Sequence, residues 1–313
     1  MSEKSEEPSE DEESELAKLF KAFDEASDEG DVERSQQLSL QVWAAMAREM
    51  EAQPEPLCLA EWRKADECES ASDWDGAEAA FKRAIAAEEA EGKLSWQGQR
   101  YLALFYSSLE RDEEAMRSIL KAAELARQAQ VSLWITGVQQ QEAALHLKRG
   151  DVETARSRLD EALEAASDEK HLKSVVVGLR LMKVECNLAS GELDTAAKEL
   201  DDLWPQVEPW RDAPMSAGFQ NALAEWWRAR ALYWEAREQE EAAVEAWRQA
   251  VHYRRIIAQA PQLEGPYKFK RLALALRALG RALQRTGSPL AAHAFTESRS
   301  LLRSIGLPET AGE

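Results

Sequence analysis

A small–large–small pattern of side chains recurs along most of the chain. In the stretch that starts at Gly150, Ala155 is followed four residues later by Leu159 and three residues after that by Ala162. These spacings place the three side chains on one stripe of an α-helix, where the small residues let a neighbouring helix approach closely. The copies along the chain are Ser35/Ser39/Val42, Ala77/Phe81/Ala84, Ala115/Ile119/Ala122, Ala155/Leu159/Ala162, Ala196/Leu200/Leu203, Ala243/Trp247/Ala250 and Ala291/Phe295/Ser298.

The pattern repeats with a step of roughly 40 residues, which is typical of a helical solenoid. We find no convincing run of alternating apolar residues, so strands are not predicted. The repeat therefore predicts seven helix pairs. Their first helices are expected at 12–28, 55–71, 94–109, 132–149, 170–189, 214–236 and 266–286, and their second helices at 31–51, 73–91, 111–129, 151–167, 192–204, 238–259 and 288–304.

Turns and linkers are predicted from glycine and proline. Glycine tolerates a positive φ, so the glycines at or beside the turns within the pairs fit this assignment. The widest irregular linker is expected at 205–214, and with 261–266 it frames the sixth pair. The glycines are Gly30, Gly76, Gly150, Gly191 and Gly287.

These units resemble the tetratricopeptide repeat family over about residues 14–306. In that family the first helix carries a Leu-Gly or Leu-Ala pair followed by an aromatic residue, as in Leu102-Ala103 with Tyr106 and, with leucine in the last place, Leu279-Gly280 with Leu283. The resemblance implies an all-α, right-handed superhelical solenoid that binds other proteins along its concave face. The step of roughly 40 residues exceeds the usual 34 of the family, so we expect a variant with longer helices or turns.

The composition supports this interpretation and limits the classes of partner that the protein is expected to bind. Of 313 residues, 44% are hydrophobic and 31% charged, and the net charge is −19. Such a charge disfavours general binding to nucleic acid or to anionic membranes. The three cysteines have no metal-type spacing and are expected to be reduced thiols. No apolar run reaches the roughly 18 residues of a membrane span, and the sequence predicts a cytoplasmic protein.

The chain divides into a solenoid and two tails. Residues 1–13 are predicted to be a disordered acidic tail, 14–306 the solenoid, and 307–313 a flexible C-terminal tail. The first 30 residues hold twelve acidic residues against three lysines, a net charge of −9. A solvated tail is the simpler interpretation, and a tethered acidic ligand for a basic surface is the alternative.

No catalytic constellation stands out in the sequence. The four histidines are scattered over different repeats, and no phosphate-binding glycine loop or nucleophile motif occurs. We therefore predict no enzymatic activity, no cofactor and no metal. Abundant carboxylates are interpreted as solvated partners of Arg and Lys on helix surfaces.

Two features suggest a binding surface. Six of the eleven tryptophans lie between residues 204 and 247, and adjacent Trp226 and Trp227 cannot both point into one seam. We expect Trp226 to line the concave groove, with Tyr233 on the same face, although core positions remain the alternative for this cluster. Residues 248–305 hold eleven basic residues against two acids, a net charge of +9.

The basic segment is interpreted either as a solvated face with Arg stems covering apolar seams or as a docking site for an acidic segment. The predicted partner-binding residues are Trp226, Tyr233, Tyr267, Lys270, Arg277, Arg281, Arg285, Arg299 and Arg303. The leading hypothesis is a scaffold or adaptor that binds a protein or peptide, preferably an acidic one. The alternatives are a ligand- or peptide-sensing regulator, autoinhibition by the acidic tail, and self-association.

Overall fold

The computed structural model describes residues 57–309 except for 130–131, 167–172, 212–216 and 261–266, together with isolated positions before residue 57. Contacts divide the chain into residues 1–60 and residues 61–313, and the description that follows concerns the second unit, with the helix that crosses the division counted as part of it. The predicted acidic tail and residues 310–313 lie outside the described residues. Most of the first predicted helix pair lies outside them as well.

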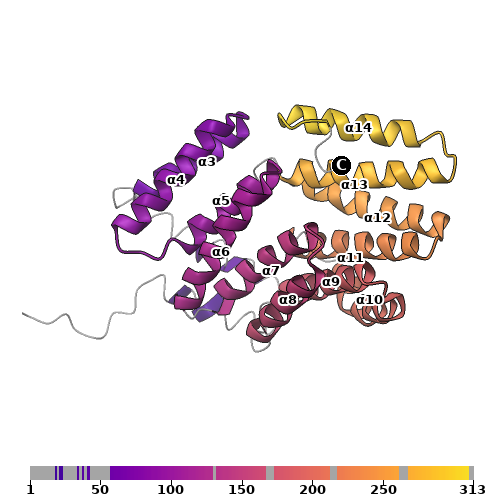
Figure 1. Cartoon of the computed structure of the whole chain (residues 1–313), viewed down its shortest axis with the longest axis horizontal. Coiled ribbons are helices and arrows are strands. Elements are labelled where there is room, and N and C mark those ends of the chain that lie inside the picture. The colour runs from indigo at the N-terminus through magenta and orange to yellow at the C-terminus, as the bar shows by residue number, and fades with distance from the viewer. Residues whose placement is uncertain are drawn as a thin grey trace, which may run out of the picture. The chain divides into compact units, whose positions relative to one another are not determined.

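Six antiparallel helix pairs follow one another between residues 57 and 309 (Figure 1), and this part of the chain contains no strand. Each predicted helix boundary in this region lies within three residues of the observed one, so the all-α solenoid is confirmed. The pairs are α3 (Leu57–Ser70) with α4 (Trp74–Ala90), α5 (Trp96–Ser108) with α6 (Asp112–Ala129), α7 (Ser132–Lys148) with α8 (Val152–Ala166), α9 (Lys173–Ala189) with α10 (Leu193–Val207), α11 (Ala217–Ala236) with α12 (Glu240–Gln259), and α13 (Tyr267–Arg285) with α14 (Ala291–Ser304).

The recurring triplets form the core of each pair, as predicted. Ala155, Leu159 and Ala162 are all fully buried on α8, and the equivalent side chains of α6 are buried in the same way. In the last pair, a side chain added at Gly280 would come within 2.9 Å of the Phe295 ring. The Leu-Gly pair of this repeat therefore lets α13 pack directly against the aromatic ring of α14.

One residue in each turn within a pair adopts a left-handed conformation, and it ends the first helix. At Gly150, with φ +77°, the next residue, Asp151, donates its N–H to the carbonyl of His146 at 2.9 Å. This is the closing bond of a Schellman motif, and each of the six turns makes the same bond. The left-handed residues are Ser72, Glu110, Gly150, Gly191, Glu238 and Gly287.

Two local predictions are wrong. Gly76 does not form a turn: it lies in the first turn of α4, where its N–H donates to the Asp73 carboxylate at 3.0 Å, and Ser72 takes the left-handed position. Helix α10 does not stop before Pro205 but continues to Val207 and into a 3₁₀ turn, Glu208–Arg211. Pro205 removes one backbone bond near the helix end, and the burial of Val207 in the core favours the helix over an early stop.

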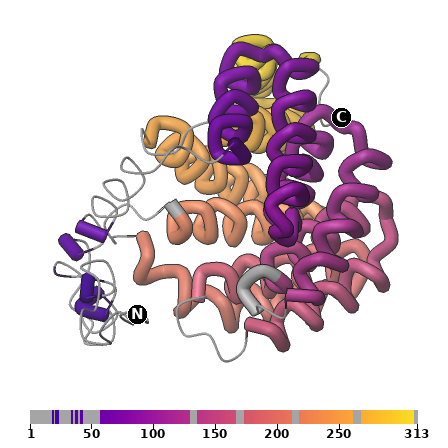
Figure 2. The backbone as a smooth tube through the Cα atoms, turned by 90° about the vertical axis from the view of Figure 1, so that its left-hand side faces the viewer, coloured from indigo at the N-terminus to yellow at the C-terminus, as the bar shows by residue number. Residues whose placement is uncertain are grey.

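The last pair of this unit contacts the first described pair. Leu302 of α14 and the following Ile305 and Leu307 form a cluster that packs against Trp74 of α4 and Leu109 after α5. In both views one end of α14 lies near one end of the α3–α4 hairpin (Figure 1, Figure 2). The predicted flexible tail begins at 307, and Leu307 itself is buried in this contact.

Candidate functional site

The first helices of five consecutive pairs line one groove. A hollow of about 590 Å³ receives side chains from α5, α7, α9, α11 and α13, and from no second helix. A second hollow of about 380 Å³ adjoins it along α11, α12 and α13. The two hollows share Glu225, Arg228 and Arg271, and we call them together the groove. The first helices therefore provide most of a single surface, to which the second helix α12 adds Trp247, Ala250 and Arg254.

A glycine on each of three successive first helices opens the floor of the groove. Gly137, Gly178 and Gly218 all line it, at intervals of 41 and 40 residues. A methyl group at Gly178 would meet only the Gln140 amide nitrogen at 3.4 Å, and one at Gly137 only the Arg100 guanidinium at 3.7 Å or more. Packing does not require glycine at these two positions, although glycine inside a helix costs about 1 kcal/mol relative to alanine. The helix backbone is thus left accessible from the groove.

Charges at the α11 end of the groove are paired with one another. Glu225 accepts from Arg228 at 2.6 Å and from Arg254, and Arg271 lies 3.6 Å away. Arg228 also donates to Glu185 of α9. The Asn221 side-chain oxygen accepts from Arg254 at 2.7 Å and from Arg271 at 3.0 Å. This network of five charged residues and one amide, the Glu225 network, joins α9, α11, α12 and α13.

The pKa shifts in the Glu225 network follow from burial and from these pairings. Burial raises the pKa of Glu225, but Arg254 and Arg228 lower it by more, so the pKa of this carboxyl lies well below its usual range. Burial lowers the pKa of Arg254 to about 10, against the opposing effect of Glu225. Burial raises the pKa of Glu185 although Arg228 opposes this. Glu225 is therefore the carboxylate on which the network depends.

The α5 end of the groove carries a cation without a counter-ion. Arg100 makes no ion pair within the described residues, and its Nε is shielded from solvent without a hydrogen-bond partner. Its guanidinium carbon lies 5.8 Å from the centre of the Tyr101 ring. Burial lowers the pKa of the Arg100 guanidinium, because no carboxylate compensates for the lost hydration. The two ends of the groove thus differ in how their charges are satisfied.

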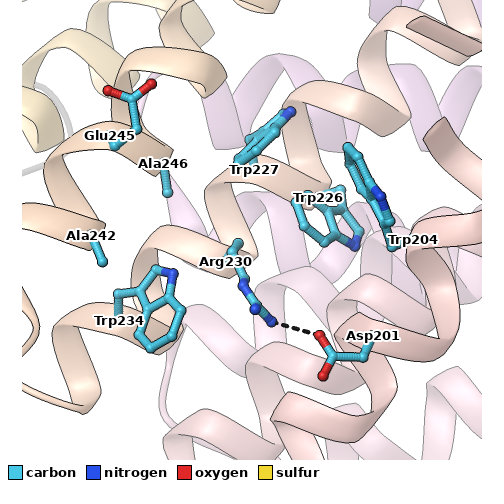
Figure 3. A pocket seen from close by; sticks show the side chains of 9 residues that line it. All are labelled: Asp201, Trp204, Trp226, Trp227, Arg230, Trp234, Ala242, Glu245 and Ala246. Carbon is cyan, nitrogen blue, oxygen red and sulfur yellow. Dashed lines mark hydrogen bonds and ion pairs between the residues drawn. The ribbon is translucent and has the colours of Figure 1, made fainter.

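An aromatic pocket of about 530 Å³ lies between α10, α11 and α12, outside the groove (Figure 3). The Trp204 and Trp226 rings lie 4.4 Å apart, and the Arg230 guanidinium lies 5.0 Å from the Trp234 ring. Arg230 also pairs with Asp201 at 2.9 Å. Most polar groups in this pocket are therefore used within the protein.

The predicted aromatic site residues lie in the core rather than along the groove. Trp226 is 5% exposed and donates its indole N–H to the carbonyl of Leu200 at 3.1 Å, and Tyr233 is 6% exposed. The expectation of a partly exposed Trp226 lining the groove is wrong, because α10 covers this side chain: the Trp204 ring lies 4.4 Å from the Trp226 ring. The side chain of Tyr267 lies outside the described residues.

Of the predicted basic residues, most are held within the protein. Lys270 donates to the carbonyl of Ser108 at 2.6 Å. Arg285 pairs with Glu235 at 2.5 Å and with Glu240 at 2.7 Å. Arg277, only 5% exposed, donates to the backbone carbonyl of Glu309, whose carboxylate pairs with Arg303.

Arg281 and Arg299 are exposed and make no ion pair within the described residues. Together with Arg277 they line a hollow of about 500 Å³ beside Phe295 and Glu309, which we call the basic hollow. The structure thus brings three of the predicted residues together.

Sequence reasoning missed most of the residues that line the groove. Arg100, Gly178 and Glu225 look unremarkable one at a time among many charged and small residues. A signal was present in the period of about 40 residues that separates Gly137, Gly178 and Gly218, since glycine is disfavoured inside helices without a packing or functional reason.

Comparison with known proteins identifies the fold. No protein-family model matches the chain, and no curated protein matches its sequence. Among solved structures it resembles NprR, in the crystal structure of NprR in complex with its cognate peptide NprX, with a TM-score of 0.58 and 10% identity over 93% of this chain and 79% of NprR. A likeness at this identity shows the fold, and the tetratricopeptide-like architecture predicted from the repeats is confirmed.

Two further solved structures match with lower TM-scores. A tetratricopeptide repeat protein from Parabacteroides merdae has a TM-score of 0.42 at 12% identity, over 80% of this chain and 92% of that one. BtubC from P. vanneervenii has a TM-score of 0.40 at 13% identity, over 80% of this chain and 88% of that one. None of the described helices combines the length and apolar character needed to cross a membrane.

Proposed function

We propose that this chain is a non-enzymatic binding protein that holds an extended peptide, free or part of a larger protein, in the groove. The single observation that carries the proposal is that all residues lining the 590 Å³ hollow come from first helices and combine charges, amides and bare glycine backbone. An extended peptide presents backbone donors and acceptors at regular intervals. The side-chain oxygens of Gln140 and Gln141 can accept from such a backbone, and the amide N–H groups of Gln140 and Asn221 can donate to it.

The resemblance to NprR supports the proposal. That structure contains a cognate peptide, NprX, on a chain of the same architecture. The floor of the present groove is also suited to a peptide, because Gly137 and Gly178 let another backbone approach the helices closely.

A groove-filling substitution tests this proposal. The full-length protein would be screened against a displayed library of random peptides, and selected peptides measured by calorimetry. Gly178→Leu places a branched side chain into the groove, where only the Gln140 amide is near. The matched control is Lys198→Leu, which adds leucine at an exposed position of the second helix α10.

We expect peptides selected by the wild type to bind Lys198→Leu unchanged and to lose at least about tenfold in affinity for Gly178→Leu. Equal binding to Gly178→Leu and to the wild type would place the peptide elsewhere and overturn the proposal. Failure to select any peptide would do so as well.

We further propose that the basic hollow gives the protein a preference for acidic partners. Arg281 and Arg299 are exposed there without ion pairs, and an arginine fork pairs well with carboxylates. Arg281→Glu with Arg299→Glu is the informative variant, because Arg277 and Arg285 hold contacts within the protein. Selection of acidic proteins from native extract should fall for this variant and remain for a variant with Arg248→Glu, an exposed arginine on α12.

A regulatory, peptide-sensing role is the second candidate. One observation favours it: the groove draws on five helix pairs, and the last pair contacts the first described pair through the Leu302 cluster. A ligand that bridges α5 and α13 would stabilise this arrangement relative to a more open one. Small-angle scattering with and without a selected peptide tests it, and an unchanged radius of gyration would count against it. Autoinhibition by the acidic tail remains a proposal, since residues 1–17 lie outside the described residues.

A further inference from the structure

Arg100 differs from every other cation that lines the 590 Å³ hollow. Lys148 pairs with Asp112 at 2.7 Å, Arg228 pairs with Glu185 and Glu225, and Arg271 lies 3.6 Å from Glu225. The Arg100 guanidinium has no carboxylate partner within the described residues, and its Nε has neither water contact nor hydrogen-bond acceptor. Among the cations of this hollow, only Arg100 therefore lacks a counter-ion.

A second unsatisfied polar group lies beside it. Gln141 is 8% exposed and lines the same hollow; its amide nitrogen donates to the backbone carbonyl of Arg100 at 3.3 Å. The Gln141 side-chain oxygen has no hydrogen-bond donor. The backbone of Gly137 lies beside the Arg100 guanidinium, and a side chain added there would meet no other atom closer than 3.9 Å. The α5 end of the groove thus offers a charged donor, an orphaned acceptor and room for a backbone to lie against α7.

A ligand that satisfies these groups must bring a negative charge and at least one N–H. A buried charge is costly unless it is paired, and a guanidinium binds a carboxylate through two parallel hydrogen bonds. The carboxylate of Glu185, which also lines the hollow, is already paired with Arg228 and does not serve Arg100. A peptide supplies both a carboxylate and backbone N–H groups.

We propose that Arg100 binds a carboxylate of the peptide held in the groove, and that the oxygen of Gln141 accepts an N–H of the same peptide. This inference rests on the proposed peptide-binding function and names the chemistry of its ligand. The carboxylate comes either from the C-terminus of a free peptide or from an Asp or Glu side chain, and the two sources are distinguishable.

The test uses three pools of short random peptides on the full-length protein. One pool lacks Asp and Glu and keeps its C-terminal carboxylate, one lacks Asp and Glu and is amidated, and one contains Asp and Glu and is amidated. Retention is measured by affinity selection with mass spectrometry for the wild type and for Arg100→Gln. The matched control is Arg180→Gln, which removes an arginine of α9 that pairs with Glu199 away from the hollow.

We expect the wild type and Arg180→Gln to retain at least one acidic pool about tenfold or more above the amidated pool without acids. Arg100→Gln should retain all pools alike. A preference for the first pool identifies the C-terminus as the source, and a preference for the third identifies a side chain.

Three results would overturn the inference. If the wild type retains peptides without preferring either acidic pool, or if Arg100→Gln keeps the preference, the inference fails while the proposed peptide binding stands. If the wild type retains no pool, both fail. Because Arg100 makes no ion pair that folding depends on, Arg100→Gln is expected to fold, and a circular-dichroism melt verifies this before the selection.

Discussion

The two ends of the groove place arginines in similar surroundings and satisfy them differently. At the α11 end, Arg228 and Arg254 share the carboxylate of Glu225, and together with Glu185 and Arg271 they link four helices. At the α5 end, Arg100 lies in the same hollow without a counter-ion. Removing one partner of a buried ion pair destabilises the fold. A shielded charge that has no counter-ion lowers the stability of the fold until a ligand pairs with it. The Glu225 network is therefore expected to stabilise the solenoid, whereas Arg100 is the arginine that we propose to bind a ligand.

Removing the central carboxylate should produce the largest effect. Glu225→Gln leaves Arg228 and Arg254 without their shared counter-ion, while Arg271 loses a nearby charge. We expect the free energy of unfolding to fall by about 3 kcal/mol, the range found when one partner of a buried pair is removed. Denaturant unfolding followed by circular dichroism measures it.

The matched control for this substitution is Glu245→Gln, at an exposed pair with Arg248 of 3.5 Å. Exposed pairs contribute little, so its effect should stay below about 0.5 kcal/mol. Equal losses from the two substitutions would show that the Glu225 network does not stabilise the fold.

The stability that Glu225 contributes should also depend on pH. Because the pKa of Glu225 is held below its ordinary value of 4.5, this contribution is complete above pH 4.5 and is lost as the pH falls below it. Glu185 acts in the opposite direction, since burial raises its pKa. The difference in unfolding free energy between wild type and Glu225→Gln isolates the first effect, and it should shrink between pH 7 and pH 3. A constant difference would contradict the assignment.

Removing the unpaired charge should have the opposite sign. Arg100→Met keeps an aliphatic side chain of similar length and deletes a shielded guanidinium without a counter-ion, so without ligand we expect the unfolding free energy to rise by about 1 kcal/mol. Arg254→Met, at the paired end, should lower it instead. Thermal and urea unfolding of the ligand-free proteins decide between these signs. Destabilisation by Arg100→Met would mean that this arginine serves the fold.

The sequence predicts the fold far better than the groove. The small–large–small stripe around Leu159 is local and repeated, so a single chain reveals both the helix pairs and their packing. Glu225 and Arg254 are far apart in sequence, and their pairing depends on which way α11 and α12 face, which the repeat does not specify. Clusters are likewise misleading: the basic run from 248 to 305 looks like one charged face, yet Arg277 and Arg285 are occupied within the protein.

The tryptophans are a second case in which the repeat pattern does not predict what a side chain contacts. The helical period separates the adjacent Trp226 and Trp227 by about 100° around the helix, yet both rings contact Trp204 of α10. It does not indicate that α10 covers Trp226 as well, because that depends on how α10 packs against α11, which brings the Trp204 ring and the Leu200 carbonyl onto Trp226. The side chain predicted for the groove is therefore buried.

The smallest effect concerns the glycine floor between the two ends of the groove. Gly178 lies inside α9 with open space in front of it, so Gly178→Ala should raise the unfolding free energy by about 0.5–1 kcal/mol through helix propensity. Gly191→Ala should lower it by about 1 kcal/mol, because φ at Gly191 is +75° and disfavours a side chain. If a peptide backbone approaches α9 closely, Gly178→Ala should weaken peptide binding while it stabilises the free protein. Stabilisation with unchanged affinity would instead show that the peptide passes this helix at a distance and is held by the side chains at the two ends.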